Sequence, residues 1–385
     1  MLSKKTKVVS SVLGSTIGAL LLSSSLAAEV KFSGTGELDL FYRTNQIKGG
    51  SEDNFRGAAN QEIAIVANVD GKHEGASILK EINWRLATKV ATDGRYDRLG
   101  LREAWIGGTT DFGEFRFGNQ FSNVYLIQDG IYGGGGAGNI WADFGAHSVQ
   151  YGRGVSYFSP NLAGFTLSAQ YDLGGKAADD VNPEKVITSY ATEVLLTYDS
   201  EYVRFDAGYH RGVNSGTMGS EADAFGGTRD SQGSGYAKAE NKAQEIYVGT
   251  VLKYDTMKLN LGFSNNHWSG EVLGGNYDKV DVNKFLARGE YGFMDKHSVS
   301  LGYQKVFDAK MDDGTGSETV GNGMNVYNFQ YNYMLTDNIS TFLQARHHTF
   351  SKEFGASVRP VGTVDGYAAG ADSVTRVLVG AFMTF

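Results

Sequence analysis

The chain has 385 residues, carries a net charge of −8 at pH 7 and contains no cysteine. The acidic balance argues against a nucleic-acid partner, which would need a basic face, and the absence of cysteine excludes a disulfide framework. Glycine is frequent (52 residues) and proline is rare (3), whereas tyrosine (21) and phenylalanine (22) are abundant. This composition excludes a disordered chain and suits a large antiparallel sheet with wide loops.

The first residues have the features of a secretory signal peptide. A basic segment contains Lys4, Lys5 and Lys7. The apolar and small residues from Val8 to Leu22 form a run too short for a convincing membrane-spanning helix, although a retained anchor is the alternative. In the stretch SSSLAAEV we expect cleavage after Ala27, with Ala28 as the next choice. Cleavage removes residues 1–27 and leaves 28–385 as one domain with 32 basic and 43 acidic residues, a net charge of −11.

Sixteen later segments alternate between apolar and polar residues. In YVRFDAGYHR (202–211), every second residue from Val203 to Tyr209 is apolar, and those between them are polar or glycine. This period of two is that of a strand with one apolar and one polar face. No segment keeps a helical period with caps, so we expect almost no helix. The expected strands lie near 29–43, 59–70, 77–89, 96–107, 113–121, 147–158, 163–173, 187–199, 202–211, 242–254, 257–267, 281–291, 297–307, 324–334, 339–350 and 373–385.

The connections between these strands alternate in length. Short ones are Asp-Ser, Asp-Thr, GFMDK and LTDN. Long, polar and Gly-rich ones are 212–241, 268–280, 308–323 and 351–372. A soluble sandwich has no reason to gather its long loops at one end, whereas an outer-membrane barrel has short periplasmic turns, long external loops and an even number of strands.

The two faces of the strands also favour a membrane barrel. Lipid cannot hydrogen-bond an exposed sheet edge, so a spanning sheet must close on itself. Aromatic residues recur at the ends of the apolar faces, as in interfacial girdles: Tyr42, Tyr171, Tyr190, Phe307 and Tyr327 at the loop end, and Tyr198, Tyr254, Tyr291 and Tyr333 at the turn end. The polar faces carry too many ionisable groups for a dry core: Glu37, Asp39, Arg204, Asp206, Arg288, Glu290 and Arg346. The sequence therefore predicts an all-β fold, a 16-stranded antiparallel transmembrane β-barrel with an aqueous lumen.

Four segments carry a family resemblance. They are EVKFSGTGELDLFYR (29–43), GLREAWIGGTTDFGEFRFGNQFS (100–122), GRGVSYFSPNLAGFTLSAQY (152–171) and the last strand VLVGAFMTF, which ends on Phe385. Together they resemble the Gram-negative general diffusion porins, whose members are usually sixteen-stranded trimers of the outer membrane. The terminal Phe385, with alternating residues before it, resembles the C-terminal signal that the barrel assembly machinery reads.

A run of four glycines lies in IYGGGGAGNIWADFG (131–145) and matches G-x-G-x-x-G from Gly133 to Gly138. No strand–helix–strand unit surrounds it and no Lys-Ser/Thr follows, which disfavours a nucleotide-binding loop. The run lies in the third loop, which in the resembled family folds into the lumen and narrows it. Glycine would supply the backbone freedom for this close approach. The resemblance makes Asp129 and Asp143 the acidic side of the constriction, with ordinary solvated carboxylates as the alternative.

The resemblance implies a basic wall facing that loop. Alternation on the third to fifth strands points four arginines inward: Arg85, Arg98, Arg102 and Arg116. Arg102 stands where the family often has a wall arginine, whereas Arg43, Arg56 and Arg153 are weaker candidates near strand ends. Opposed charges across a water-filled neck create a transverse field that orders water and dipolar solutes and penalises apolar ones.

The chain also departs from the family pattern. It lacks the acidic Pro-Glu-Phe-Gly-Gly type of third loop and has Trp141 in that loop. Trp141 could stack on sugar rings, as in sugar-selective porins, or simply pack the loop against the wall; Tyr125 and Tyr132 beside it in the neck would favour the sugar interpretation. The second loop, near residues 90–95, is short, and in the family that loop often latches neighbouring subunits.

We expect no metal, no cofactor and no enzymatic activity. Neighbouring strand residues His347 and His348 point to opposite faces and cannot hold one ion, and the calcium-loop spacing of 308–318 fails at Lys310. Neither G-x-S-x-G nor H-E-x-x-H occurs. The expected function is passive diffusion of ions and small hydrophilic solutes through a homotrimer in contact with outer-membrane lipid and lipopolysaccharide. The net charge leans toward cations, although the neck charges decide. A sugar-selective porin and a surface adhesin or structural barrel are the alternatives.

Overall fold

The computed structural model describes residues 29–46, 58–91, 100–133, 146, 150–178, 186–214, 240–272, 277–320, 323–351 and 373–385. The predicted signal peptide, residues 1–27, lies outside the described residues. Within the described ranges, no helix has the length and apolar character needed to cross a membrane.

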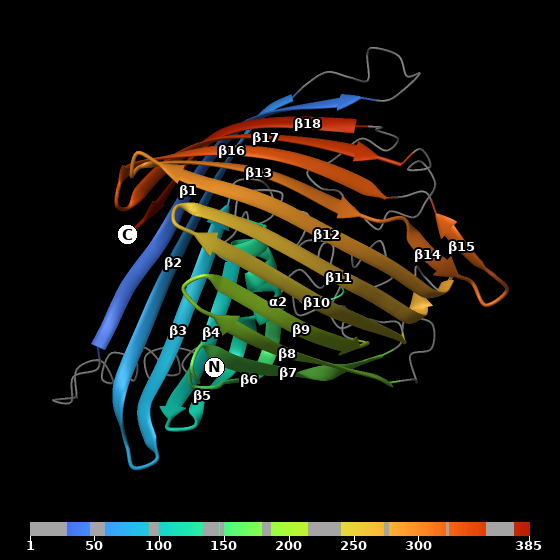
Figure 1. The fold of residues 1–385 in the computed structure, drawn as a ribbon. Coiled ribbons are helices and arrows are strands. Elements are labelled where there is room, and N and C mark those ends of the chain that lie inside the picture. The colour runs from blue at the N-terminus through green and yellow to red at the C-terminus, as the bar shows by residue number, and fades with distance from the viewer. Residues whose placement is uncertain are drawn as a thin grey trace, which may run out of the picture.

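The described strands form one closed antiparallel sheet (Figure 1). The ring contains β1 (Glu29–Gln46), β2 (Ala58–Ala76), β3 (Leu79–Ala91), β4 (Gly100–Thr110), β5 (Gly113–Phe121), β6 (Gln150–Phe158), β7 (Phe165–Ala178), β8 (Val186–Asp199), β9 (Val203–Val213), β10 (Asn241–Tyr254), β11 (Met257–Val272), β12 (Tyr277–Phe293), β13 (His297–Val306), β16 (Met324–Thr336), β17 (Ile339–Phe350) and β18 (Ser373–Thr384). Each pairs with its neighbour in the chain, and β1 pairs with both β2 and β18, which closes the ring. The predicted 16-stranded barrel is confirmed.

A short hairpin was not predicted from the sequence. It consists of β14 (Ala309–Asp312) and β15 (Ser317–Val320), and β14 pairs with β12 at the loop end. Because β13 pairs directly with β16, the hairpin extends from the ring, and its two strands are not barrel strands (Figure 1). Its turn is held by Asp313, whose pKa is lowered by hydrogen bonds from the Thr315 hydroxyl and from the backbone N–H groups of Thr315 and Gly316.

Exposure alternates along the strands as the sequence pattern predicts. On β8, Val194 and Leu196 are 44% and 40% exposed, whereas Leu195 between them and Glu193 and Thr197 on either side are buried. The exposed set is apolar and covers the outside of the ring, and the covered set is mostly polar and faces inward. Such a barrel places its apolar surface in lipid and its polar surface around the lumen.

The expected aromatic residues lie at the ends of the outer face. Tyr42, Tyr171 and Tyr327 are exposed at the loop end, and Tyr254 and Tyr291 are exposed at the turn end. Their amphipathic rings suit the headgroup level of a bilayer.

Short and long connections alternate around the described ring. The turns that join β2 to β3, β10 to β11 and β12 to β13 contain residues with positive φ: Ser77, Asp255, Met294 and Asp295. The third loop begins with a helical turn, α2 (Asn123–Leu126), followed by a π-helical turn, η2 (Ile127–Tyr132). Both lie against the polar face of β8 to β11, within the ring of strands (Figure 1). The expectation of almost no helix agrees with these two short elements.

The closing seam between β1 and β18 gives a testable prediction. Gly34 and Phe385 exchange two backbone hydrogen bonds of 2.9 and 3.1 Å, and a Cβ on Gly34 would overlap the Phe385 ring and the Val66 carbonyl. We expect Gly34→Val to destabilise the refolded barrel by about 1–3 kcal/mol, the usual cost of overpacking. Urea-induced unfolding in detergent micelles measures this change. Gly316→Val, where a Cβ meets open space, should leave the unfolding midpoint unchanged; equal loss in both variants would contradict the seam argument.

A candidate channel constriction

The third loop turns away from the ring at a β-bulge. The register between β5 and β6 shifts between Gly118 and Gln120, and a bulge bends its strand and increases the local twist. Gly118 has a φ of 132°, a conformation that favours glycine. The chain therefore changes direction directly before Ser122, the N-cap residue of α2.

One wall carboxylate, Glu193 on β8, holds the start of the loop. Its Oε1 accepts hydrogen bonds from the backbone N–H groups of Asn123 (2.8 Å) and Val124 (3.1 Å). Its Oε2 accepts from the Ser122 hydroxyl (2.5 Å) and the Tyr151 hydroxyl (3.4 Å). The negative charge also lies at the N-terminus of α2, where the free N–H groups favour an anion. Glu193 is thus the anchor of the described part of the loop.

Two further wall carboxylates bind the loop along η2. The Gln128 amide donates to Glu245 of β10 at 2.7 Å, and Lys284 of β12 lies 3.8 Å from the same carboxylate. The Tyr132 hydroxyl donates to Asp206 of β9 at 2.8 Å. These acids accept hydrogen bonds that keep the loop on the wall.

An apolar cluster fills the space between the loop and the wall. It contains Val124, Ile127 and Tyr132 from the loop, with Leu195, Tyr247, Val251 and Leu286 from β8, β10 and β12. The rings of Tyr132 and Tyr247 meet edge to face with centroids 5.6 Å apart. Burial of these side chains adds a hydrophobic contribution to the polar anchors. An apolar patch on the inner face of the ring thus seats the loop against β8 to β12.

Of the two predicted loop acids, one is described. Asp129 lies in the first turn of η2 and is half-buried. Asp143 lies outside the described residues, as does Trp141. Asp129, the one predicted loop acid that the structure describes, therefore lies on the loop segment that is held against the wall.

Two predicted wall arginines form ion pairs with wall carboxylates. Arg85 of β3 lies 2.6 Å from Asp70 and 3.4 Å from Glu103, on the neighbouring strands. Arg116 of β5 lies 2.7 Å from Glu114. The carboxylates offset much of the positive charge at these positions. The sequence interpretation did not include these ion pairs.

The other two predicted arginines have different positions. Arg98 lies outside the described residues. Arg102 lies where the register between β3 and β4 shifts, and its guanidinium stands 4.8 Å from the centroid of the Phe121 ring. At a bulge, simple alternation does not assign a face, so the sequence argument for Arg102 loses its basis.

Trp105 is an aromatic residue on this wall that the sequence interpretation did not single out. Its ring lies 4.3 Å from the Arg116 guanidinium, and its indole N–H donates to Glu103 at 3.4 Å. Tyr125 stacks on Phe121 with centroids 5.9 Å apart, and Tyr132 is buried against Tyr247. Tyr125 and Tyr132, whose presence in the neck would favour the sugar interpretation, thus pack against Phe121 and Tyr247.

A second group of arginines lies on β17 and β18. Arg346 and Arg376 occupy directly opposed register positions on the inner face and are 4% and 3% exposed. Arg43 of β1 has the next register position in the same row, opposite Arg376. Arg376 lies 4.2 Å from the centroid of the Phe41 ring. The side chains of Arg346 and Arg376 therefore lie close together on the inner face of the ring.

The described residues contain no group of three or more His, Asp or Glu side chains placed to hold a metal ion. His347 contacts the Thr375 hydroxyl at 2.9 Å from the half-buried outer side, whereas His348 is buried on the inner side. The two rings point to opposite faces, as alternation predicts.

The sequence profile of the Gram-negative porins matches residues 14–353. The chain belongs to this family. Among curated proteins, chitoporin of Vibrio furnissii is 32% identical over 87 residues, which span 21% of this chain and only 24% of chitoporin. This porin is accordingly a member of a family of outer-membrane channel proteins.

Solved structures agree with the fold. The anion-selective porin from Comamonas acidovorans superimposes with a TM-score of 0.67 at 12% identity, over 93% of this porin and all of that chain (100%). The trimer form of OmpT from Vibrio cholerae gives 0.63 at 15% identity, over 93% and 100%. OmpF of Salmonella typhi gives 0.59 at 13% identity, over 92% and 97%. At these identities the likeness concerns the fold.

The Glu193 anchor gives a second prediction. Glu193→Ala removes the acceptor of the Val124 N–H and of the Ser122 hydroxyl, whereas the Asn123 N–H keeps the Gln170 amide oxygen and the Tyr151 hydroxyl keeps His210. Each buried donor left unsatisfied costs roughly 1–3 kcal/mol. We expect a stability loss of about 3 kcal/mol or more in urea unfolding, together with added open-channel noise in single-channel records. Glu290→Gln is the matched control, because Glu290 pairs with Arg288 on the wall at 2.6 Å. Quiet currents from Glu193→Ala would contradict the anchoring role.

Proposed function

We propose that this porin forms a water-filled channel for passive diffusion of ions and small hydrophilic solutes. The observation that supports it most is the third-loop segment bound by Glu193, Glu245 and Asp206 to the polar face of the ring. A loop seated there narrows the passage while the remaining polar wall keeps it wet. Width and charge then select solutes without covalent chemistry.

Single-channel recording in planar bilayers tests this proposal. Purified folded protein should give steady steps of large conductance, and trimers should give steps in groups of three. Absence of conductance from folded protein would overturn the transport function and favour a surface adhesin or structural barrel.

The setting of the channel is part of the proposal. Residues 1–27 are removed as a signal peptide, and 28–385 form the mature domain. The mature chains form a homotrimer in the outer membrane, in contact with lipid and lipopolysaccharide, after insertion by the barrel assembly machinery through the strand that ends at Phe385. The trimer form of OmpT, a porin of the same fold, supports this assembly.

We also propose a transverse field in the neck. Asp129, with Asp143, supplies the negative side. The predicted positive side was Arg85, Arg98, Arg102 and Arg116. Arg346 and Arg376, which lie directly opposite each other on the inner face of β17 and β18, add to this positive potential. Charges near a narrow aqueous path act through the potential they create there and need no direct contact with the ion.

Removal of this positive charge should shift ion selectivity. We expect the double variant Arg346→Gln and Arg376→Gln to lower the permeability of chloride relative to potassium by about two- to threefold, the effect of a local potential change of roughly one kT. Reversal potentials under a potassium chloride gradient measure the ratio. Lys296→Gln, an exposed cation in the turn between β12 and β13, controls for net charge. An unchanged permeability ratio in the double variant would show that Arg346 and Arg376 do not determine ion selectivity.

A sugar-selective channel is the second candidate, favoured by the partial likeness to chitoporin. In that case Trp141, and Trp105 on the described wall, would offer aromatic faces to sugar rings. Chito-oligosaccharides should then block the current reversibly, and Trp141→Ala should weaken the block about tenfold, since an aromatic contact contributes roughly 0.5–1.5 kcal/mol beyond its buried area. Current that chito-oligosaccharides leave unchanged would exclude this candidate.

A further inference from the structure

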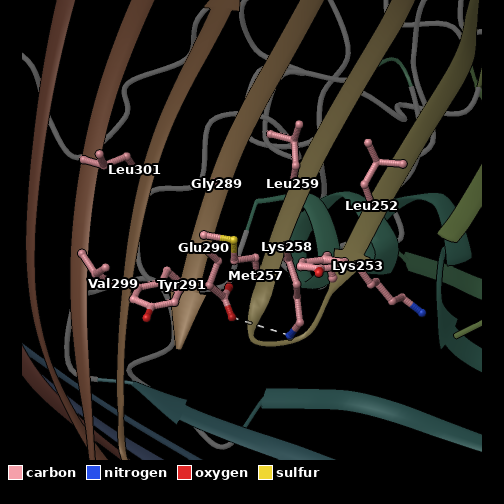
Figure 2. A pocket seen from close by; sticks show the side chains of 11 residues that line it. Leu252, Lys253, Met257, Lys258, Leu259, Gly289, Glu290, Tyr291, Val299 and Leu301 are labelled. Atoms are coloured by element: carbon pink, nitrogen blue, oxygen red, sulfur yellow. Dashed lines mark ion pairs between the residues drawn. The ribbon is translucent and has the colours of Figure 1, made fainter. Parts of the chain in front are cut away.

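The outer wall of the barrel contains an apolar groove at the turn end of β10 to β13 (Figure 2). Its volume is about 420 Å³. Two register rows form it: Leu252, Leu259, Gly289 and Leu301 in the first, and Tyr254, Met257, Tyr291 and Val299 in the second. All of these positions face outward, because their strand neighbours Lys258 and Glu290 pair with each other on the inner face at 3.6 Å.

Gly289 creates the groove. A Cβ built on this residue meets nothing within 4 Å, so the wall is lower here by a whole side chain. The next outward residue on β12 is Ala287, which is also small. The floor of the groove therefore follows β12, between Leu259 of β11 and Leu301 of β13.

The groove begins at the level where the bilayer becomes polar. Tyr254 and Tyr291 stand at its turn end with exposed rings, as interfacial tyrosines do. Toward the loops, the next outward residue on β12 is Ala287, in the part of the wall that faces hydrocarbon. The groove is continuous with the membrane-facing surface of the barrel, which is the established environment of this outer-membrane family.

We propose that this groove binds one acyl chain of a phospholipid from the periplasmic leaflet. The chain enters beside the two tyrosines, so that the ester and phosphate groups stay at the polar level. Lipid tails and leucine side chains are equally apolar, and therefore the preference over bulk lipid comes from contact. An empty groove leaves its lining without partner atoms on one side, and a seated chain restores those dispersion contacts.

The groove favours a chain over a second barrel. Leu259 and Leu301 form its two walls and project on both sides of a narrow floor. A single flexible chain can lie along this floor. The charged residues of the lining, Lys253, Lys258 and Glu290, occupy inner-face positions of their strands, and the outward-facing residues are apolar, aromatic or glycine. The recognised group is therefore the chain and not the headgroup. This inference depends on the membrane location of the barrel and not on its transport activity.

Native mass spectrometry tests the proposal. The full folded protein, exchanged into a short-chain detergent, is equilibrated with phosphatidylethanolamine or with phosphatidylglycerol of the same acyl chains. We expect one retained lipid per chain, with equal affinity for both headgroups. Gly289→Leu adds a side chain at a position where a Cβ meets nothing within 4 Å, and it should weaken retention about tenfold, the loss for about two methylenes that no longer find contact. Ala169→Leu, an outward-facing position on β7, is the matched control and should retain the lipid.

The outcomes separate the possible occupants. Equal retention by Gly289→Leu and the unchanged protein would overturn the proposal. So would a change of oligomeric state in Gly289→Leu without loss of lipid, because the groove would then be filled by a second copy. Conductance serves as an independent check, since Gly289 faces away from the lumen and its substitution should leave the channel current unchanged.

Discussion

Every backbone hydrogen-bonding group of this protein that lies in the hydrocarbon must find a partner within the sheet, and the remaining features depend on that constraint. The ring satisfies it by pairing β1 with β18, where Gly34 and Phe385 exchange two hydrogen bonds at the end of the chain. Closure also fixes which way each side chain points. Apolar residues then face lipid, and the charged residues that alternate with them on the same strands face the lumen. A porin interior is thus a consequence of a closed sheet with alternating residues.

A wet interior creates a problem for any segment that must stay inside it, because water competes for the hydrogen bonds of the loop. The third-loop segment solves it by using charged acceptors and by excluding water locally. Glu193, Asp206 and Glu245 accept hydrogen bonds from the loop, and charge-assisted bonds of this kind are about twice as strong as neutral ones. The cluster around Tyr132 and Tyr247 keeps the same region dry. The acids of this wall therefore position the loop, a role that the sequence pattern did not predict.

The sequence predicted the ring well because each strand carries its own signal in a period of two, independent of the others. The sequence carries less information about the neck, because the neck depends on cross-strand register, which no single strand contains. Arg85 was expected to be an open wall cation, but Asp70 and Glu103 stand beside it on the neighbouring strands. Arg346 and Arg376 meet only through the pairing of β17 with β18. One usable signal was overlooked: Leu195, Tyr247 and Leu286 are apolar on the inward face of polar strands, and these exceptions to alternation mark the place where the loop packs.

The same logic applies to the outer wall, where exceptions to the rule also carry information. An outward position on a membrane strand normally bears a large apolar residue, because that residue fills the boundary with lipid. Gly289 breaks this pattern between Leu259 and Leu301, and no residue of the described ranges fills the space above it. A glycine in a strand destabilises the sheet, because it loses more backbone entropy on folding and has no side chain to pack. The groove therefore lowers stability unless another molecule occupies it. Lipid is the one partner that a membrane supplies at every position of that face, and its chains have the shape of the gap.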